Sequence, residues 1–357
     1  MDDDGRLSFE YDPQQVLPLS GRVAGMCHCL NRLPVLPELL EDLARELVEQ
    51  SIHASAAISG NPMRLDEVRE ELARDPVEPS PAGPTVARAR REIANLGLAY
   101  APLPKLRTES GVFNVSEAFV RKVHAVTVQG TVPDGVGQYV PDQDGESPGM
   151  AARKLVERIN GAGFAEETQA VRAGLLHYHL FRLRPFAEGS GRVARFFEAS
   201  ILAVAGFRLA CLSLPQYYRK NIDAYLGWFR PGEPDSLQAR TGFLCFQLTG
   251  LLQGLEQLHE RLTAPLQALA LAEQYRQLFA SRQLNRRSHE LLLLLLQRDP
   301  AEPAGFQLKD LFLRQPYKLL YDKVSEHTAR RDLNRLLELG LLSKEGLRYA
   351  LVKRLPC

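Results

Sequence analysis

The segment RPFAEGSGRVAR, residues 184–195, contains the side chains in this chain that are best suited to chemistry. Gly189 and Gly191 permit positive φ angles and let a ligand approach the backbone closely. A helix expected from Arg192 onward would direct its free N–H groups and the positive end of its dipole at a ligand above the loop. These features predict a cradle for an anion such as phosphate.

Charged and aromatic side chains beside the glycines agree with that prediction. Arg192 and Arg195 are three residues apart, which places two cations on one helix face. Glu188 offers the hard oxygen that suits a Mg²⁺ bridging phosphates, and Phe186 is expected to anchor the loop in the core. A glycine-rich turn with salt-bridged arginines explains the same spacing, so the spacing alone leaves both interpretations open.

The elements that must position this loop are predicted to be helices. Residues 36–50 place four leucines on one face of an amphipathic helix, and more helices follow a proline-rich connector at residues 75–84. From residue 150 to about 280 nearly every stretch has a helical pattern. Residues 129–149 instead form a long loop, and such loops in compact domains are often functional. We therefore expect an all-α body with one irregular flap.

A different kind of unit is predicted for residues 282–357. They include 15 Lys or Arg and 9 Asp or Glu, a net charge of +6, whereas the whole chain has +1. Three predicted helices, the third ending at Gly340, precede two short strands around a glycine turn. This order is typical of a winged helix-turn-helix.

In a winged helix-turn-helix the third helix enters the major groove of DNA and the wing contacts the backbone. This interpretation places near the bases Glu326, His327, Thr328, Arg330 and Arg331. It places near the phosphates Lys344, Arg348, Lys353 and Arg354. A module for packing or homodimer formation, with solvated arginines, explains the same segment, so duplex DNA and a second copy of the chain are both candidate partners.

Composition and cysteine usage restrict the classes of function. With 357 residues, 45% hydrophobic and 24% charged, the chain is long enough for about two or three domains. Five scattered cysteines give no disulfide framework, and Cys27 and Cys29 lack a second cluster that would complete a zinc site. The acidic start has no secretory pattern, and the longest apolar block, residues 291–296, is too short to span a bilayer. We expect a cytoplasmic protein with no membrane partner.

The stretch LHYHLFRLRPFAEGSGRVAR resembles the signature of the Fic/Doc family, usually H-P-F-x-(D/E)-G-N-G-R-x-x-R. The positions in register are Pro185, Phe186, Glu188, Gly189, Gly191, Arg192 and Arg195. SAAISGN at residues 55–61 resembles the family's N-terminal inhibitory helix, usually S-x-x-I-E-G-N, and VPDGVGQYV at 132–140 resembles its flap. LSLPQYYRKNIDAYL at 212–226 resembles the segment that flanks the nucleotide base.

This resemblance implies an activity and its ligands. Members of the family transfer AMP from ATP to a protein hydroxyl, which implies ATP or another nucleotide, Mg²⁺ held by Glu188, and a protein target bound through the flap at 129–149. The nucleotide contacts that it implies are Phe186, Gly189, Ser190, Gly191, Arg192, Arg195, Tyr217, Asn221 and Tyr225. The domains that it implies are a helical extension at 1–84 with an inhibitory region at 51–68, a Fic-like core at 85–280, and the winged helix at 282–357.

The chain departs from the family at the position of the catalytic base. Arg184 stands where the family has the histidine that takes the proton from the hydroxyl, and a guanidinium with a pKa above about 12 cannot accept a proton near neutral pH. General-base assistance is typically worth about a hundred- to ten-thousand-fold in rate. The usual transfer should therefore be lost or weak.

Three further departures accompany Arg184. Ser190 replaces the motif asparagine, and Val140 stands where the flap often has arginine. Ser59, followed by Gly60, replaces the inhibitory glutamate that pairs with the second motif arginine, here Arg195. An enzyme without its base has no activity left to restrain, so these losses are consistent with one another.

The combined prediction is a degenerate Fic-domain protein that binds a nucleotide or phosphate and acts as a regulator or interaction module. The alternative is an active protein adenylyltransferase with a non-standard base. His177 and His179 lie just before the loop and could be proposed for that role. On a helix they point about 200° apart, so at most one of them faces the site.

Overall fold

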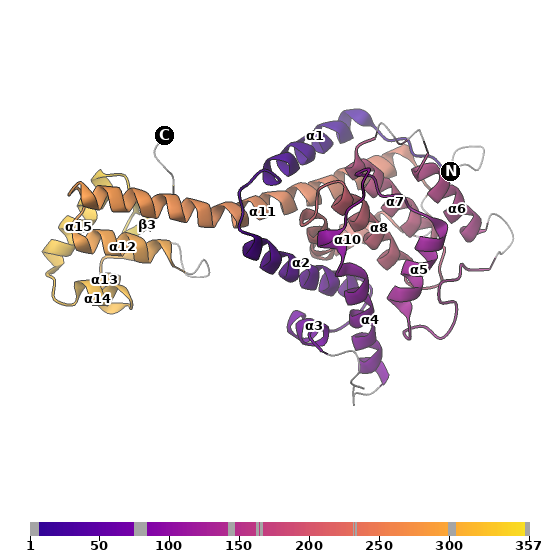
Figure 1. Ribbon diagram of the computed structural model, residues 1–357, viewed down its shortest axis with the longest axis horizontal. Helices are drawn as coiled ribbons and strands as arrows, with labels where there is room; N and C mark the ends of the chain where they lie inside the picture. The colour runs from indigo at the N-terminus through magenta and orange to yellow at the C-terminus, as the bar shows by residue number, and fades with distance from the viewer. Residues whose placement is uncertain are drawn as a thin grey trace. The chain divides into compact units, whose positions relative to one another are not determined.

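The computed structural model describes residues 7–74, 84–141, 147–161, 164, 167–230, 232, 234–298 and 305–353 (Figure 1). The chain divides into two compact units, Met1–His259 and Glu260–Cys357. Part of the predicted flap, residues 142–146, and the predicted phosphate contact Arg354 lie outside the described residues. In the part of the chain that is described, no helix has the length and apolarity needed to cross a membrane.

The first unit is built from helices. They are α1 (Pro13–Leu30), α2 (Pro37–Ile58), α3 (Leu65–Leu72), α4 (Pro84–Tyr100), α5 (Glu117–Val128), α6 (Pro148–Ile159), α7 (Gln169–Leu183), α8 (Ser190–Val204), α9 (Leu214–Lys220), α10 (Ile222–Gly227) and the first part of α11 (Leu237–Ala280). Two 3₁₀ turns, η1 (Leu103–Lys105) and η3 (Ala210–Ser213), join some of them. The mostly helical body predicted from the sequence is confirmed.

Helices α7 and α8 form the centre of this unit (Figure 1). Every residue of α8 except Gly191 is buried, and in α7 residues 170–180 are buried without interruption. Helices buried on all sides must be covered by others, and α2, α5 and α6 pack against this pair. The core therefore fixes both ends of the loop that joins α7 to α8.

Local sequence explains where the neighbouring helices begin and end. The Thr168 side chain caps α7 by accepting the N–H of Val171. Helix α2 ends at Ile58, and Gly60 follows with a φ of +91°, which favours glycine. The helix predicted at residues 36–50 is confirmed and extends to Ile58.

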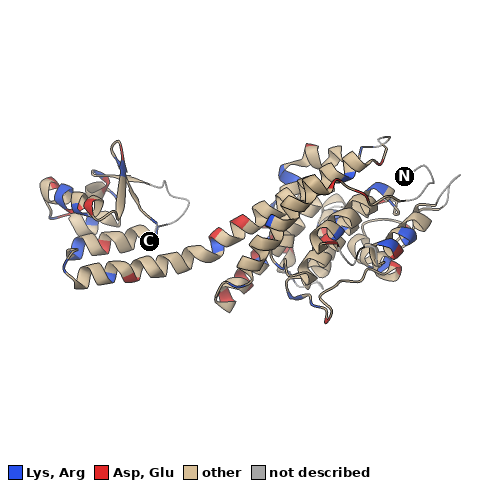
Figure 2. Ribbon diagram, turned by 90° about the horizontal axis from the view of Figure 1, so that it is seen from above, with Lys and Arg blue, Asp and Glu red and all other residues tan. Residues whose placement is uncertain are grey.

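The second unit combines helices with a small sheet. Its helices, besides the end of α11, are α12 (Arg286–Leu296), α13 (Asp310–Leu313), α14 (Tyr317–Tyr321) and α15 (Glu326–Glu338). Strands β1 (Phe306–Gln307), β2 (Leu342–Glu345) and β3 (Arg348–Leu351) form an antiparallel sheet in the order β1-β3-β2. Basic and acidic residues are interspersed over the elements of this unit (Figure 2). The predicted long helix before Gly340 and the hairpin around Gly346 are present, whereas β1 and α14 were not predicted.

Candidate functional site

The loop between α7 and α8 begins at a residue with unusual backbone geometry. Arg184 caps the C-terminus of α7 with φ 44° and ψ 56°, the left-handed region that few residues other than glycine adopt. Pro185 follows and cannot continue the helix. The Arg184 side chain is exposed, and it makes no hydrogen bond or ion pair with any residue that the structure describes. Its guanidinium is open to solvent.

Packing accounts for both glycines of the loop. Gly189 has a φ of +83°, and a Cβ there would lie 2.9 Å from Cγ1 of Val128. A Cβ at Gly191 would lie only 2.2 Å from Cε2 of Phe181. The close approach of α5 to Gly189 and of α7 to Gly191 thus favours glycine at both positions, whether or not a ligand binds.

Phe186 and Ser190 hold the loop on the core. The Phe186 ring is buried and stacks on the ring of His124, with centroids 3.8 Å apart and planes inclined by 5°. The Ser190 hydroxyl donates to the carbonyl oxygen of Phe186 at 3.1 Å and accepts its N–H at 3.2 Å. The Ser190 side chain is therefore used within the loop itself.

His124 on α5 joins this loop to the flap, a role that the sequence did not indicate. Its Nδ1 accepts the N–H of Gly137 at 3.0 Å, so the proton sits on Nε2, which donates to the carbonyl oxygen of Glu188 at 3.0 Å. The flap also donates from the N–H of Val140 to the carbonyl oxygen of Pro185 at 2.9 Å. Burial lowers the pKa of His124 below its ordinary value, which favours the neutral ring that this geometry needs.

Arg195 is buried beneath α2. Its Nε donates to the Ser55 hydroxyl at 2.9 Å, and a terminal nitrogen donates to the Ser55 carbonyl at 2.9 Å and to the Ser59 hydroxyl at 3.2 Å. The structure thus brings the predicted inhibitory position, Ser59, into contact with the second motif arginine. Among the residues that the structure describes, only neutral oxygens accept from these donors, in contrast to the carboxylate expected for the family.

A chain of buried polar groups continues from Arg195 into the core. Arg195 donates to the Tyr225 hydroxyl at 3.3 Å, and that hydroxyl lies 2.9 Å from Nε2 of His177. Nδ1 of His177 lies 2.9 Å from a Glu198 oxygen, whose partner oxygen accepts the Tyr218 hydroxyl at 2.7 Å. Burial raises the pKa of Tyr225 to about 12. Tyr225 and His177 are fully enclosed and support Arg195 from within the core.

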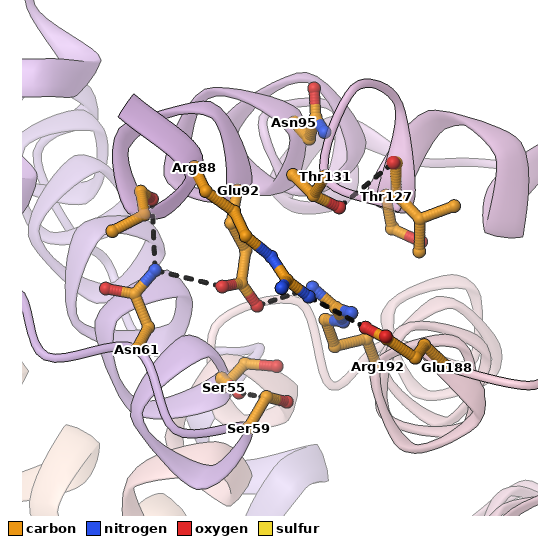
Figure 3. A network of polar contacts seen from close by, with 12 residues as sticks. Ser55, Ser59, Asn61, Arg88, Glu92, Asn95, Thr127, Thr131, Glu188 and Arg192 are labelled. Carbon is orange, nitrogen blue, oxygen red and sulfur yellow. Dashed lines mark hydrogen bonds and ion pairs between the residues drawn. The ribbon is translucent and has the colours of Figure 1, made fainter. Parts of the chain in front are cut away.

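Two residues of α4 pair with charged groups of the loop and of α8 (Figure 3). Arg192 lies 2.5 Å from Glu92, and their side chains are only 8% and 12% exposed. Arg88 lies 2.9 Å from Glu188, and these side chains are 58% and 51% exposed. In each pair the two partners are 100 residues apart in the sequence. Neither Arg88 nor Glu92 was identified from the sequence pattern.

The family model described as Fic/DOC matches residues 114–202, which contain α5, α6, α7, the loop and most of α8. The sequence likeness to this family therefore rests on residues 114–202. We call them the Fic segment below. No protein with a curated description matches the chain.

Solved Fic structures resemble the chain at low sequence identity. A Fic-domain-containing signaling protein from Bacteroides thetaiotaomicron is 17% identical, with a TM-score of 0.53 over 70% of this chain and 97% of that one. Fic-1 from C. elegans is 19% identical, with a TM-score of 0.51 over 68% of this chain and 71% of that one. A Fic family protein from Desulfovibrio desulfuricans is 17% identical, with a TM-score of 0.48 over 99% of this chain and 100% of that one. The first two likenesses show the Fic fold.

Three predicted nucleotide contacts lie after the Fic segment, and two of them, Tyr217 and Asn221, contact residues outside the loop. Tyr217 packs on Phe246, with ring centroids 4.9 Å apart, and over Gly250, where a Cβ would lie 2.3 Å from its ring. The Asn221 amide donates to the carbonyl oxygen of Tyr217 at 2.9 Å. Within the described ranges, neither side chain has a hydrogen bond or ring contact with residues 184–195.

The carboxylate that would hold the Mg²⁺ implied by the family is that of Glu188 in the loop. Across the ranges that the structure describes, no group of three or more His, Cys, Asp or Glu could hold a metal. Mg²⁺ nevertheless keeps several waters and often takes only one or two carboxylates together with phosphate oxygens. A half-exposed Glu188 fits that mode of binding once Arg88 moves away.

The residues predicted to contact DNA lie on α15 and the hairpin. Ser325 caps α15 by accepting the N–H of Thr328, and Arg330 pairs with Glu326 one turn away. The Lys344 ammonium lies over the Tyr349 ring, 5.3 Å from its centroid. The exposed residues of the predicted set are Glu326, His327, Arg330, Arg331, Lys344, Arg348 and Lys353, and Thr328 is half-buried.

Proposed function

We propose that the Fic segment binds a nucleoside phosphate with Mg²⁺ and that base-catalysed AMP transfer is lost or weak. The observation that carries this proposal is Arg184, an exposed guanidinium at the position of the family's base. It cannot accept a proton near neutral pH. The protein then acts as a regulator or interaction module whose state depends on the bound nucleotide.

Three features support retained binding. The N-terminus of α8 follows Gly189 directly, so its free N–H groups can donate hydrogen bonds to a phosphate. Arg184 adds an exposed cation to Arg192 and Arg195, and Glu188 can hold the metal. With Ser59 in place of a carboxylate, the charge of Arg195 remains uncompensated by the inhibitory helix.

Covalent transfer is tested by intact-mass spectrometry after incubation with Mg-ATP. We expect no AMP on the wild type and AMP on Arg184→His, because the histidine restores a base beside an otherwise similar loop. Arg184→Ala, which removes the cation without supplying a base, should stay unlabelled. AMP on the wild type would instead support an active adenylyltransferase with another base. Calorimetry that detects no binding of ATP, ADP or AMP would overturn the proposed nucleotide site.

We further propose that the second unit is a winged helix-turn-helix that binds duplex DNA. The order of α12, β1, α13, α14, α15 and the β2-β3 hairpin supports this assignment, and α15 presents Arg331 without an ion-pair partner among the described residues. A domain for self-association is the competing function.

The salt dependence of binding to a labelled duplex distinguishes these functions. We expect affinity to fall steeply as salt rises, and Lys344→Ala to reduce the slope of log K against log salt by about 0.9 for the lost phosphate contact. Arg335→Ala serves as the control, since Arg335 pairs with Glu338 near the end of α15. Self-association that is insensitive to salt, without DNA binding, would contradict the proposal.

A further inference from the structure

Helix α4 presents one anionic and one cationic side chain, a single turn apart, to Arg192 in α8 and to Glu188 in the loop before it. Glu92 meets Arg192, and Arg88 meets Glu188 (Figure 3). Residues four apart lie on the same face of a helix, so one side of α4 carries both contacts. Helix α4 precedes the segment that the family model matches.

Glu92 and Arg88 each carry a charge of the same sign as the ligand that we propose for the residue they contact. A Glu92 carboxylate on Arg192 takes the place of a phosphate oxygen, and an Arg88 guanidinium on Glu188 takes the place of Mg²⁺. We propose that α4 is a built-in competitor for the nucleotide site, and that Glu92 and Arg88 must leave their partners before a metal-bound phosphate can bind. This inference rests on the proposed function and names the regulation of that same site.

The two contacts are unequal. The Glu92–Arg192 pair is almost fully enclosed, and separating one partner of such a pair leaves a desolvated charge, which is strongly unfavourable unless another anion replaces it. The Arg88–Glu188 pair is more than half exposed, and such pairs contribute little. Glu92 is therefore the main competitor, and Arg88 has a smaller effect on the metal.

Asn61 fixes the Glu92 side chain in the competing position. Its Nδ2 donates to the second Glu92 oxygen at 2.9 Å and to the carbonyl oxygen of Ala89 at 3.0 Å. Glu92 thus keeps one oxygen on Asn61 while the other faces Arg192 (Figure 3). A competitor held in this way loses little side-chain freedom when it pairs, which strengthens its competition with a free ligand.

The chain segment that orients Glu92 also covers the second motif arginine. Asn61 follows Ser59, whose hydroxyl contacts Arg195 at the end of α2. Helix α2 also packs against α4. The end of α2, the residues that follow it and α4 therefore enclose both motif arginines together. Glu92 contributes the negative charge that position 59 lacks.

Calorimetric titration of Mg-ATP into the full chain tests the competition. Glu92→Gln keeps an acceptor for Asn61 but removes the charge, so we expect Mg-ATP to bind at least about tenfold more tightly than to the wild type. Glu71→Gln is the matched control, because it removes the same charge from α3, where Glu71 pairs with Arg74 and Arg90. Its affinity should stay within about twofold of the wild type.

Arg88→Gln gives a test with the opposite charge change. Loss of a cation should weaken the binding of an anion by simple electrostatics, yet the competition predicts up to about fivefold tighter binding of ATP when Mg²⁺ is present. Without Mg²⁺ that gain should disappear. Weaker binding in both conditions would show that Arg88 does not compete with the metal, and would overturn that half of the proposal.

The outcomes separate this inference from the proposed function. Equal affinities of wild type and Glu92→Gln, with measurable binding, would overturn the competitor role and leave the nucleotide site intact. No binding by the wild type or any variant would overturn the nucleotide site, and the competitor role with it. If Glu92→Gln does not fold, as judged by circular dichroism, Glu92→Asp replaces it: the shorter side chain keeps the charge but cannot reach Arg192 as closely, so tighter binding is again expected.

Discussion

Gly191 is constrained by its neighbours in the core. Its missing Cβ would meet the Phe181 ring at 2.2 Å, and that ring is held by Phe229, whose centroid is 4.2 Å away. Overpacking of this kind typically costs about 1–3 kcal/mol, so Gly191→Ala should lower the free energy of unfolding by that amount. Urea denaturation measures the change.

Gly25 supplies the control for that measurement. It lies inside α1, is exposed, and has no atom within 4 Å of the position of a Cβ. Gly25→Ala should raise stability by about 0.5–1 kcal/mol, because alanine is the better helix former. If Gly191→Ala is neutral, the close packing of α7 on α8 does not limit this position and the ligand-based explanation of the glycine gains weight.

Single residues of the loop were predictable where the pattern is local, and unpredictable where the partner is distant. Phe186 and Gly189 follow from the spacing of the motif. Arg184 stands out because it occupies the position where the motif has histidine, while the residues beside it match the motif. Nothing local marks Glu92 as the partner of Arg192, since 100 residues separate them and only the packing of α4 brings them together. His124 is likewise one histidine on an ordinary amphipathic helix until the flap folds over it.

At the scale of elements, helices with a strong apolar stripe were predicted, and helices without one were missed. Helix α2 places Leu43 and Leu47 in the core, and its pattern was sufficient. Helix α1 buries Val16, Ser20, Val23 and Cys27, of which only the valines are strongly apolar, and it contains Pro18. The buried residues of α1 have helical spacing, but their hydrophobic signal in the sequence is weak. This helix is stabilised by tertiary contacts rather than by helix propensity, and the sequence does not show those contacts.

The second unit shows the same limit for very short elements. Strand β1 has only two residues, Phe306 and Gln307, and exists because β3 offers an edge to pair with. Helix α14 has five residues after Pro316. Elements of this length have no measurable periodicity, so their formation depends on neighbours that the sequence alone does not place.

For the first unit as a whole, stability should depend on pH through two buried histidines. Burial lowers the pKa of His124 and lowers that of His179 to about 4. In the unfolded chain both should titrate near pH 6.5. Because the unfolded state then binds more protons below that pH, the stabilisation is complete above pH 6.5 and is lost as the pH falls towards the folded pKa values.

Urea denaturation between pH 7.5 and 5 measures this loss. His179 alone should remove about 2 kcal/mol from the free energy of unfolding by pH 5, since each unit of pH below 6.5 contributes about 1.4 kcal/mol. His124→Gln offers an N–H to the Glu188 carbonyl but does not titrate, so its stability should fall less steeply with acid than that of the wild type. Parallel slopes for the two proteins would contradict the role of His124. They would mean that protonation of its Nδ1, which removes the acceptor of the Gly137 N–H, does not lower the free energy of unfolding.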